Sequence, residues 1–155
     1  MGTQDLTAPM DAVSYFVTVR TFGCKPVFDD PAKAETLVDV METHRRAHGA
    51  KKYAYAVLPD HYHALFGSGP QSRTIADLIL AINRAVEHFL EMPDDGQPLW
   101  DAEAEVTVLY STGARIEKLN YIHHKPVLCG LVEKPEDYAH SSAAYYFRRY
   151  GKVEF

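Results

Sequence analysis

Two histidines separated by one residue are the first candidates for chemistry in this sequence. His61 and His63 fall in the run 61–66, whose composition and spacing are typical of a β-strand. Because side chains alternate between the two faces of a strand, both imidazoles turn to one face, about 7 Å apart along the chain. Two imidazoles so placed can converge on one divalent cation, but a third ligand has to come from another element.

A tyrosine further along the chain lies off the apolar stripe of a predicted helix. The helix is expected from about Ala114 until Pro126, which forbids further propagation. Projection at about 100° per residue turns Tyr121 away from the apolar residues and places three polar side chains one turn from it. These three side chains are Glu117, His124 and Lys125. The tyrosine is therefore either a rim residue with its hydroxyl in water or a functional group with polar company.

The elements that position these residues alternate between strands and helices. Strands are expected at 13–19, 52–58, 61–66 and 106–110, and helices beginning at Pro31, at Ile75 and near Ala114. The short link Pro59-Asp60 favours an antiparallel hairpin between the second and third strands. The order predicts an α+β, ferredoxin-like split βαβ fold (β-α-β-β-α-β) with an antiparallel sheet and one added C-terminal helix.

Length and composition are those of one compact domain. The chain has 155 residues, of which 46% are hydrophobic and 24% charged. Residues 1–11 are expected to form a flexible arm, and residues 12–155 a single domain. The two cysteines, Cys24 and Cys129, are far apart and form no Cys-x-x-Cys pair, so a reducing cytoplasm is the simplest location. No signal peptide and no apolar stretch of membrane-spanning length is apparent, so no membrane partner is expected.

The charge pattern leaves two readings open. The net charge of −5 counts against a protein that tracks a long phosphate backbone. Basic residues nevertheless gather in two places and are candidate phosphate contacts, although solvated surface faces would explain them equally. The two groups are Arg45, Arg46, Lys51 and Lys52, and Arg148 and Arg149 near the end of the chain.

Two segments resemble a known family. Residues 58–63, LPDHYH, are similar to the Met-Pro-Asn-His-x-His strand signature of the single-tyrosine HUH transposases, especially the REP-associated tyrosine transposase group. Residues 121–132, YIHHKPVLCGLV, are similar to that family's Tyr-Ile-x-x-Asn-Pro-Val-x-x-Gly-Leu-Val segment. The resemblance continues through 135–142 and covers the chain from Val13 to about Phe147.

The resemblance implies a metal-dependent endonuclease and strand transferase that acts on single-stranded or hairpin DNA, as a monomer or a homodimer. Tyr121 would be the nucleophile, His61 and His63 would hold a divalent metal ion (Mg²⁺ or Mn²⁺), and cleavage would leave a 5′-phosphotyrosine. Such an enzyme would serve DNA transposition or the mobilisation of REP elements.

One departure from the family's pattern concerns the third metal ligand. Lys125 occupies the position, one turn beyond the tyrosine, where the wider family has Asn or Gln, and an ammonium cannot coordinate a cation. Helical geometry offers His124 as the ligand, or Glu117 as ligand or base, with Lys125 contacting the scissile phosphate instead.

Other functions fit the same residues. A descendant of this fold could bind nucleic acid without cutting it, as the acidic balance and Lys125 suggest. A small metalloenzyme could use His61, His63 and His124 to activate water on a small substrate, and its activity would survive loss of Tyr121. An interaction module without catalysis would retain no divalent ion.

Overall fold

Four strands form one antiparallel sheet in a computed structural model that describes residues 13–68, 74–92 and 95–155. The strands are β1 (Ser14–Arg20), β2 (Lys51–Leu58), β3 (His61–Gly67) and β4 (Glu105–Leu109), each within one residue of its predicted bounds. They lie in the order β2-β3-β1-β4, which is the arrangement expected of a split βαβ fold. The arm expected over 1–11 lies outside the described residues.

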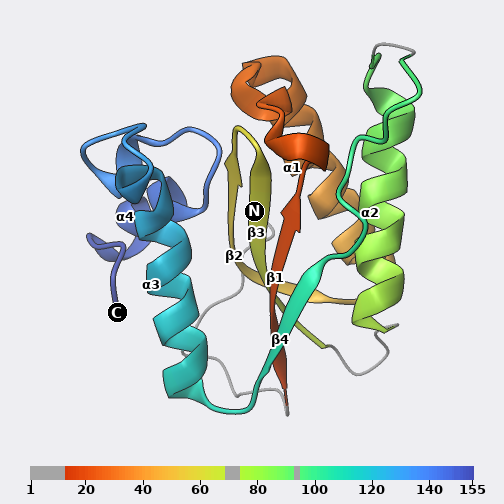
Figure 1. Cartoon of the computed structure of the whole chain (residues 1–155). Helices are drawn as coiled ribbons and strands as arrows, with labels where there is room; N and C mark the ends of the chain where they lie inside the picture. Colours follow the sequence, from red (N-terminus) through yellow and green to blue (C-terminus); the bar gives the residue numbers. More distant parts are fainter. Residues whose placement is uncertain (1–12, 69–73, 93–94) are drawn as a thin grey trace.

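Helices cover both faces of this sheet (Figure 1). The helices α1 (Pro31–Ala47) and α2 (Ile75–Phe89) pack against each other on one face. The helices α3 (Thr112–Leu128) and α4 (Ala143–Tyr150) lie on the other. Short 3₁₀ turns occupy Phe22–Cys24, Val27–Asp29 and Pro135–Asp137. The predicted α+β fold is confirmed.

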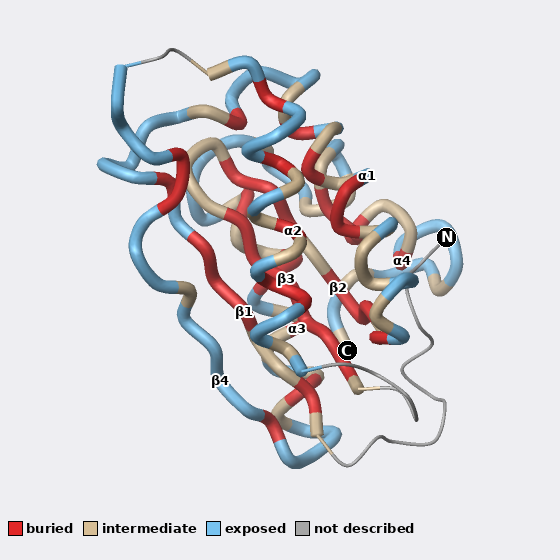
Figure 2. Tube along the Cα trace, turned by 90° about the vertical axis from the view of Figure 1, so that its right-hand side faces the viewer, coloured by how far each residue is buried: buried red, intermediate tan, exposed pale blue. Residues whose placement is uncertain are grey.

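The strand β3 serves two hydrophobic cores, as its alternation requires. Tyr62, Ala64 and Phe66 belong to the core beneath α1 and α2, whereas Leu65 belongs to the core beneath α3. Because His61 and His63 share the phase of Leu65, both imidazoles point to the α3 face. By contrast, β4 at the outer edge of the sheet is largely exposed (Figure 2).

The C-terminal third differs from the prediction in two ways. Pro126 does not end α3 but lies in its last turn, where it removes one backbone donor while the Cys129 N–H still donates to the Lys125 carbonyl at 2.9 Å. A second helix, α4, follows the single added helix that was predicted. Its eight residues bury only Ala143 and Tyr146, which is too few for a helical period to stand out.

A buried histidine ties α3 to the rest of this layer. The Nδ1 atom of His123 lies 2.8 Å from the Val153 carbonyl oxygen, so it carries the proton and donates. The Nε2 atom lies 2.8 Å from the Ser142 hydroxyl, which in turn accepts from the Tyr55 N–H of β2 at 3.0 Å. Burial lowers the pKa of His123 to about 4, against the weaker opposing effect of its bond to Val153.

No helix among the described residues is both long and apolar enough to cross a membrane.

The lowered pKa of His123 predicts acid sensitivity of the fold. The unfolded chain binds a proton at this histidine below about pH 6.5, whereas the folded chain does so only near pH 4. The contribution of the neutral His123 to the free energy of unfolding is therefore fully present above about pH 6.5 and is lost as the pH falls towards 4. We expect His123→Gln to remove about 2 kcal/mol of the stability difference between pH 7 and pH 5, measured by urea unfolding. A variant with the same pH dependence as the wild type would contradict this assignment.

Candidate functional site

The two predicted histidines meet on the α3 face of β3. Their ring centroids are 4.8 Å apart and the ring planes are inclined by 81°. The Nδ1 atom of His61 donates to the Asp60 carboxylate at 2.6 Å, and the Nδ1 atom of His63 is hydrogen-bonded to the Thr18 hydroxyl at 2.9 Å. With both Nδ1 atoms engaged, the Nε2 atoms are left for a ligand.

Both imidazoles are neutral at physiological pH. Burial lowers the pKa of His63 to about 3, and repulsion from His61 when that ring is protonated and from the Lys125 ammonium contributes in the same direction. Burial also lowers the pKa of His61, although its bond to Asp60 opposes the shift. The Nε2 atom of His63 is buried and has no hydrogen-bond partner in the described part of the chain. A buried imidazole nitrogen without a hydrogen-bond partner is suited to a metal ion or to a polar group of a substrate.

Tyr121 reaches this pair from α3. The centroid of the Tyr121 ring lies 5.6 Å from that of His63 and 5.9 Å from that of Phe16, and both contacts are edge-to-face. Phe16 also stacks on His63, with 5.4 Å between the ring centroids, so each of the three rings packs against the other two. Tyr121 is 38% exposed while the adjacent Ile122 and His123 are buried, as the projection of the helix predicted. The phenol is therefore accessible and held next to the imidazoles.

Two lysines of α3 stand on either side of the phenol. The Lys125 Nζ lies 5.7 Å from the centroid of the Tyr121 ring, and the Lys118 Nζ lies 5.9 Å from the same centroid. Arg20, the cross-strand neighbour of His61, adds a third cation but is paired with Glu105 at 2.8 Å. The phenol thus lies among cations, which favours an anionic substrate.

Two solved structures with a similar fold carry the name of a transposase. A REP-associated tyrosine transposase, solved bound to a REP hairpin, superposes with a TM-score of 0.77 at 17% identity, over 90% of this chain and 82% of the other. A protein of Deinococcus radiodurans R1 that is provisionally named a transposase superposes with a TM-score of 0.54 at 25% identity, over 79% of this chain and 98% of the other. No family model and no curated protein matches the sequence.

The chain has the tyrosine-transposase fold. The predicted resemblance to these transposases is confirmed by the structural neighbours.

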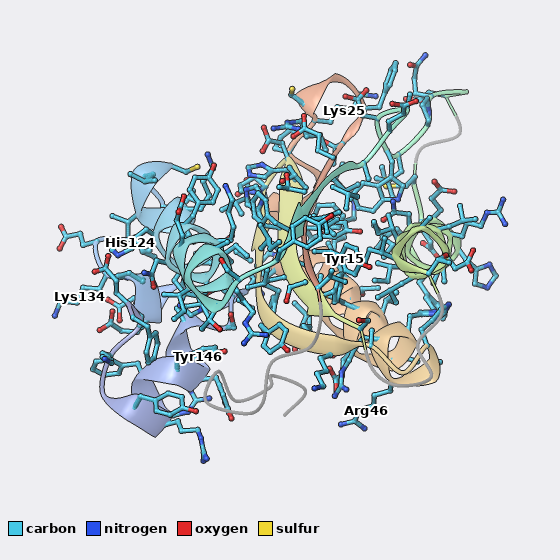
Figure 3. The ribbon with its side chains drawn as sticks, turned by 90° about the horizontal axis from the view of Figure 1, so that it is seen from below. Tyr15, Lys25, Arg46, His124, Lys134 and Tyr146 are labelled. Atoms are coloured by element: carbon cyan, nitrogen blue, oxygen red, sulfur yellow. The ribbon has the colours of Figure 1, made fainter. Side chains whose placement is uncertain are left out.

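In this transposase fold the predicted third ligand is not brought to the histidines. The Nε2 atom of His124 instead lies 3.7 Å from the Glu154 carboxylate, on the side of α3 that faces away from the sheet (Figure 3). Glu117 is exposed on α3. Within residues 13–68, 74–92 and 95–155, no three His, Cys, Asp or Glu side chains gather as a metal site. The rotation of α3 that aims Tyr121 at His63 carries His124 past the site, towards the C-terminal tail.

Most of the predicted phosphate contacts lie elsewhere. Arg45, Arg46 and Lys52 all pair with the Glu42 carboxylate, at 2.8, 2.7 and 3.1 Å. Lys52 is 3% exposed and cannot reach a phosphate, so that prediction is wrong. Arg45 and Arg46 end α1, on the sheet face opposite α3. The physical reason is that a buried ammonium needs a carboxylate partner, and Glu42 lies one turn before both arginines.

The other basic residues are also remote from the phenol. Lys51 begins β2 opposite Gly67, at the far end of β3 from His61. Arg148 and Arg149 end α4, where the Arg149 Nε donates to the Tyr150 hydroxyl at 3.3 Å. Of the cations near the site, Lys125 was predicted from the sequence, whereas Lys118 and Arg20 were not.

Three further residues that contact the histidines or the tyrosine were not predicted from the sequence. Asp60 directly precedes His61, and Thr18 and Phe16 share one phase of the first strand. Only the pairing of β1 with β3 shows that Thr18 lies opposite His63 and Phe16 opposite Leu65.

The Glu42 cluster predicts a stability effect without an effect on the site. We expect Glu42→Gln to destabilise the fold by about 3 kcal/mol, because it leaves the Lys52 ammonium buried without a carboxylate. The double variant Glu42→Gln/Lys52→Met should recover most of that loss, since no buried charge remains. Urea unfolding of both variants measures the effect, and a double variant as unstable as Glu42→Gln alone would contradict it.

Proposed function

We propose that this protein is a metal-dependent single-stranded DNA endonuclease and strand transferase, with Tyr121 as its nucleophile. The observation that carries the proposal is the approach of an accessible phenol to two neutral imidazoles within one chain, 5.6 Å between the Tyr121 and His63 rings. The fold shared with a REP-associated tyrosine transposase supports the same class of activity. A role in DNA transposition follows from both.

His61 and His63 would hold the divalent metal ion through their Nε2 atoms. The donor set fits such an ion, because hydrogen bonds between the Nδ1 atoms and Asp60 or Thr18 would orient the imidazoles for binding a metal through Nε2. The unpartnered buried Nε2 of His63 supports the same assignment. Mg²⁺ or Mn²⁺, when bound, supplies Lewis-acid polarisation of a phosphate oxygen. Water and substrate oxygens would complete the coordination, in place of a third side chain.

The side chains around Tyr121 orient it and balance charge. Phe16 packs against both Tyr121 and His63, which fixes the angle at which the phenol approaches the histidines. Lys125 would contact the scissile phosphate, where its ammonium offsets the charge that develops in the transition state.

The proposed reaction exchanges one phosphate ester for another. The Tyr121 oxygen attacks phosphorus, the bond from phosphorus to the 3′-oxygen breaks, and a 5′-phosphotyrosine forms. The phenol loses one proton and the departing 3′-oxygen gains one, so water is not consumed. Because phenolate is a competent leaving group, a second 3′-hydroxyl can reverse the step and join strands.

The partner would be single-stranded or hairpin DNA. The structural neighbour was solved with a REP hairpin, which supports a hairpin as the first substrate to test. Tyr121 and both histidines lie in one chain, so a monomer would suffice, and a homodimer is not required for the site. Cys24 and Cys129 are free and exposed, which is consistent with a cytoplasmic enzyme.

Covalent trapping tests the proposed nucleophile. Incubation with single-stranded and hairpin oligonucleotides and Mn²⁺ should yield a protein–DNA adduct that denaturing gels and intact mass detect. We expect Tyr121→Phe to abolish the adduct completely while the fold is retained, because phenylalanine keeps the ring contacts and lacks the attacking oxygen. The matched control Tyr110→Phe removes a hydroxyl from a 74% exposed tyrosine and should form the adduct normally.

The absence of an adduct from the wild type, with DNA binding intact, would favour a non-cleaving relative of this fold. Activity on a small substrate that survives Tyr121→Phe but not His61→Ala would instead indicate a metallohydrolase.

Metal titration tests the ligands separately from cleavage. We expect His61→Ala and His63→Ala each to weaken Mn²⁺ binding by more than about tenfold in calorimetry, since each removes one of two ligands. The control His124→Ala should bind Mn²⁺ like the wild type, because His124 faces Glu154. Weakened binding by His124→Ala, or unchanged binding by His63→Ala, would overturn the two-histidine site.

A further inference from the structure

Two lysines lie close to the phenol and have no carboxylate partner among the described residues. Arg20 pairs with Glu105, Lys25 with Asp95 and Lys52 with Glu42. Among the described residues, neither Lys118 nor Lys125 forms an ion pair with a carboxylate. Both are half-buried, so their charge lies at the site and not in bulk solvent.

Lys118 has its own surroundings within the site. Its Nζ lies 5.0 Å from the centroid of the Phe16 ring, closer than to the Tyr121 ring at 5.9 Å. Phe16 in turn stacks on His63. The two aromatic faces hold the ammonium by cation–π attraction, but they offer no acceptor for its three N–H donors. An anionic oxygen at this position would accept hydrogen bonds from the Lys118 ammonium.

The spacing of the two lysines suits two points on one chain of phosphates. Lys118 and Lys125 are seven residues apart, nearly two turns, so they share a face of α3 with Tyr121 between them. Their Cα atoms are about 10 Å apart along the helix axis. Backbone charges in a stacked strand repeat about every 3.4 Å along its axis, and less densely in an extended strand. A phosphate at Lys118 would then lie within about three nucleotides of the one at Lys125.

We propose that Lys118 binds a second backbone phosphate of the single-stranded DNA, so that the strand runs along α3 past Tyr121. This inference rests on the proposed function, in which Lys125 contacts the scissile phosphate. Two fixed phosphates on either side of the phenol would set the direction from which phosphorus meets the attacking oxygen. One phosphate alone would leave the strand free to pivot.

The test uses the full chain with Tyr121→Phe, so that binding is measured without cleavage. The probe is a strand selected by this variant from random single-stranded oligonucleotides, then made with one uncharged methylphosphonate linkage at each position in turn. We expect Lys118→Met to lower the slope of log affinity against log salt by about 0.7, the value for one phosphate contact on a single strand. Lys33→Met, on α1 at the opposite sheet face, is the matched control and should leave the slope unchanged.

The methylphosphonate series assigns the phosphate. One uncharged linkage should weaken the binding of the strand by the Tyr121→Phe protein. The same linkage should cause no loss of affinity in the protein that carries both Tyr121→Phe and Lys118→Met. A different linkage, within about three nucleotides, should behave in that way with Lys125→Met. Lys118→Arg should keep the contact, and Lys118→Gln should lose it, which guards against a single misfolded variant.

Three results would overturn the inference: a Lys118→Met protein that binds like Lys33→Met, a loss spread evenly over all linkages, or the same linkage for both lysines. Failure of the proposed function is a separate observation. A wild-type protein that forms no adduct would remove the nuclease activity and leave the phosphate contact of Lys118 standing.

Discussion

The pairing of β1 with β3 is the constraint on which the site depends. In this register Thr18 lies opposite His63 and Arg20 opposite His61, so the hydroxyl that orients one imidazole and the cation beside the other come from the neighbouring strand. A shift of one residue would turn Thr18 and Phe16 to the opposite face of the sheet and place a valine opposite His63 in place of Thr18. The register is fixed from the other side, because Val17, Val19, Tyr62 and Ala64 fill the core beneath α1 and α2. Packing on one face of the sheet therefore sets the chemistry on the other.

The orientation of α3 is the second requirement, and it is set at both ends of the helix. Near its start, the buried Arg115 guanidinium lies 4.3 Å from the centroid of the Tyr53 ring of β2. Near its end, His123 joins the Ser142 hydroxyl and the Val153 carbonyl. Leu119 and Ile122 lie between these anchors in the core. Because Tyr121 directly precedes Ile122 on the helix, the packing that buries Ile122 also orients Tyr121 along the sheet towards His63.

The sequence predicted what depends on local periodicity. Alternation placed His61 and His63 on one face, and helical projection separated Tyr121 from the buried His123. The projection did not predict where His124 lies, because it gives the angles between side chains around the helix and does not say which side of the helix faces the sheet. A helix turned by a few tens of degrees could present either His124 or Lys125 to the sheet, and contacts with a tail some thirty residues later decide between them. The role of Lys52 could not be predicted from local periodicity, because its partner Glu42 lies on α1 and only the folded chain brings the two together.

The placement of the cations reconciles an acidic protein with the anionic substrate that we propose. The net charge of −5 would repel a long phosphate backbone if the charge were spread evenly. At physiological ionic strength, however, exposed charges act over only about 8 Å. Acidic residues at distant elements are screened from the phenol, whereas Lys118 and Lys125 lie within 6 Å of its ring. Arg45, Arg46 and Lys52 stabilise the fold through Glu42 and add little to the field at the site. Under the proposed function, such a protein would attract a short stretch of backbone at one place and disfavour non-specific binding along a duplex, which is the behaviour required of an enzyme that has to find one strand position.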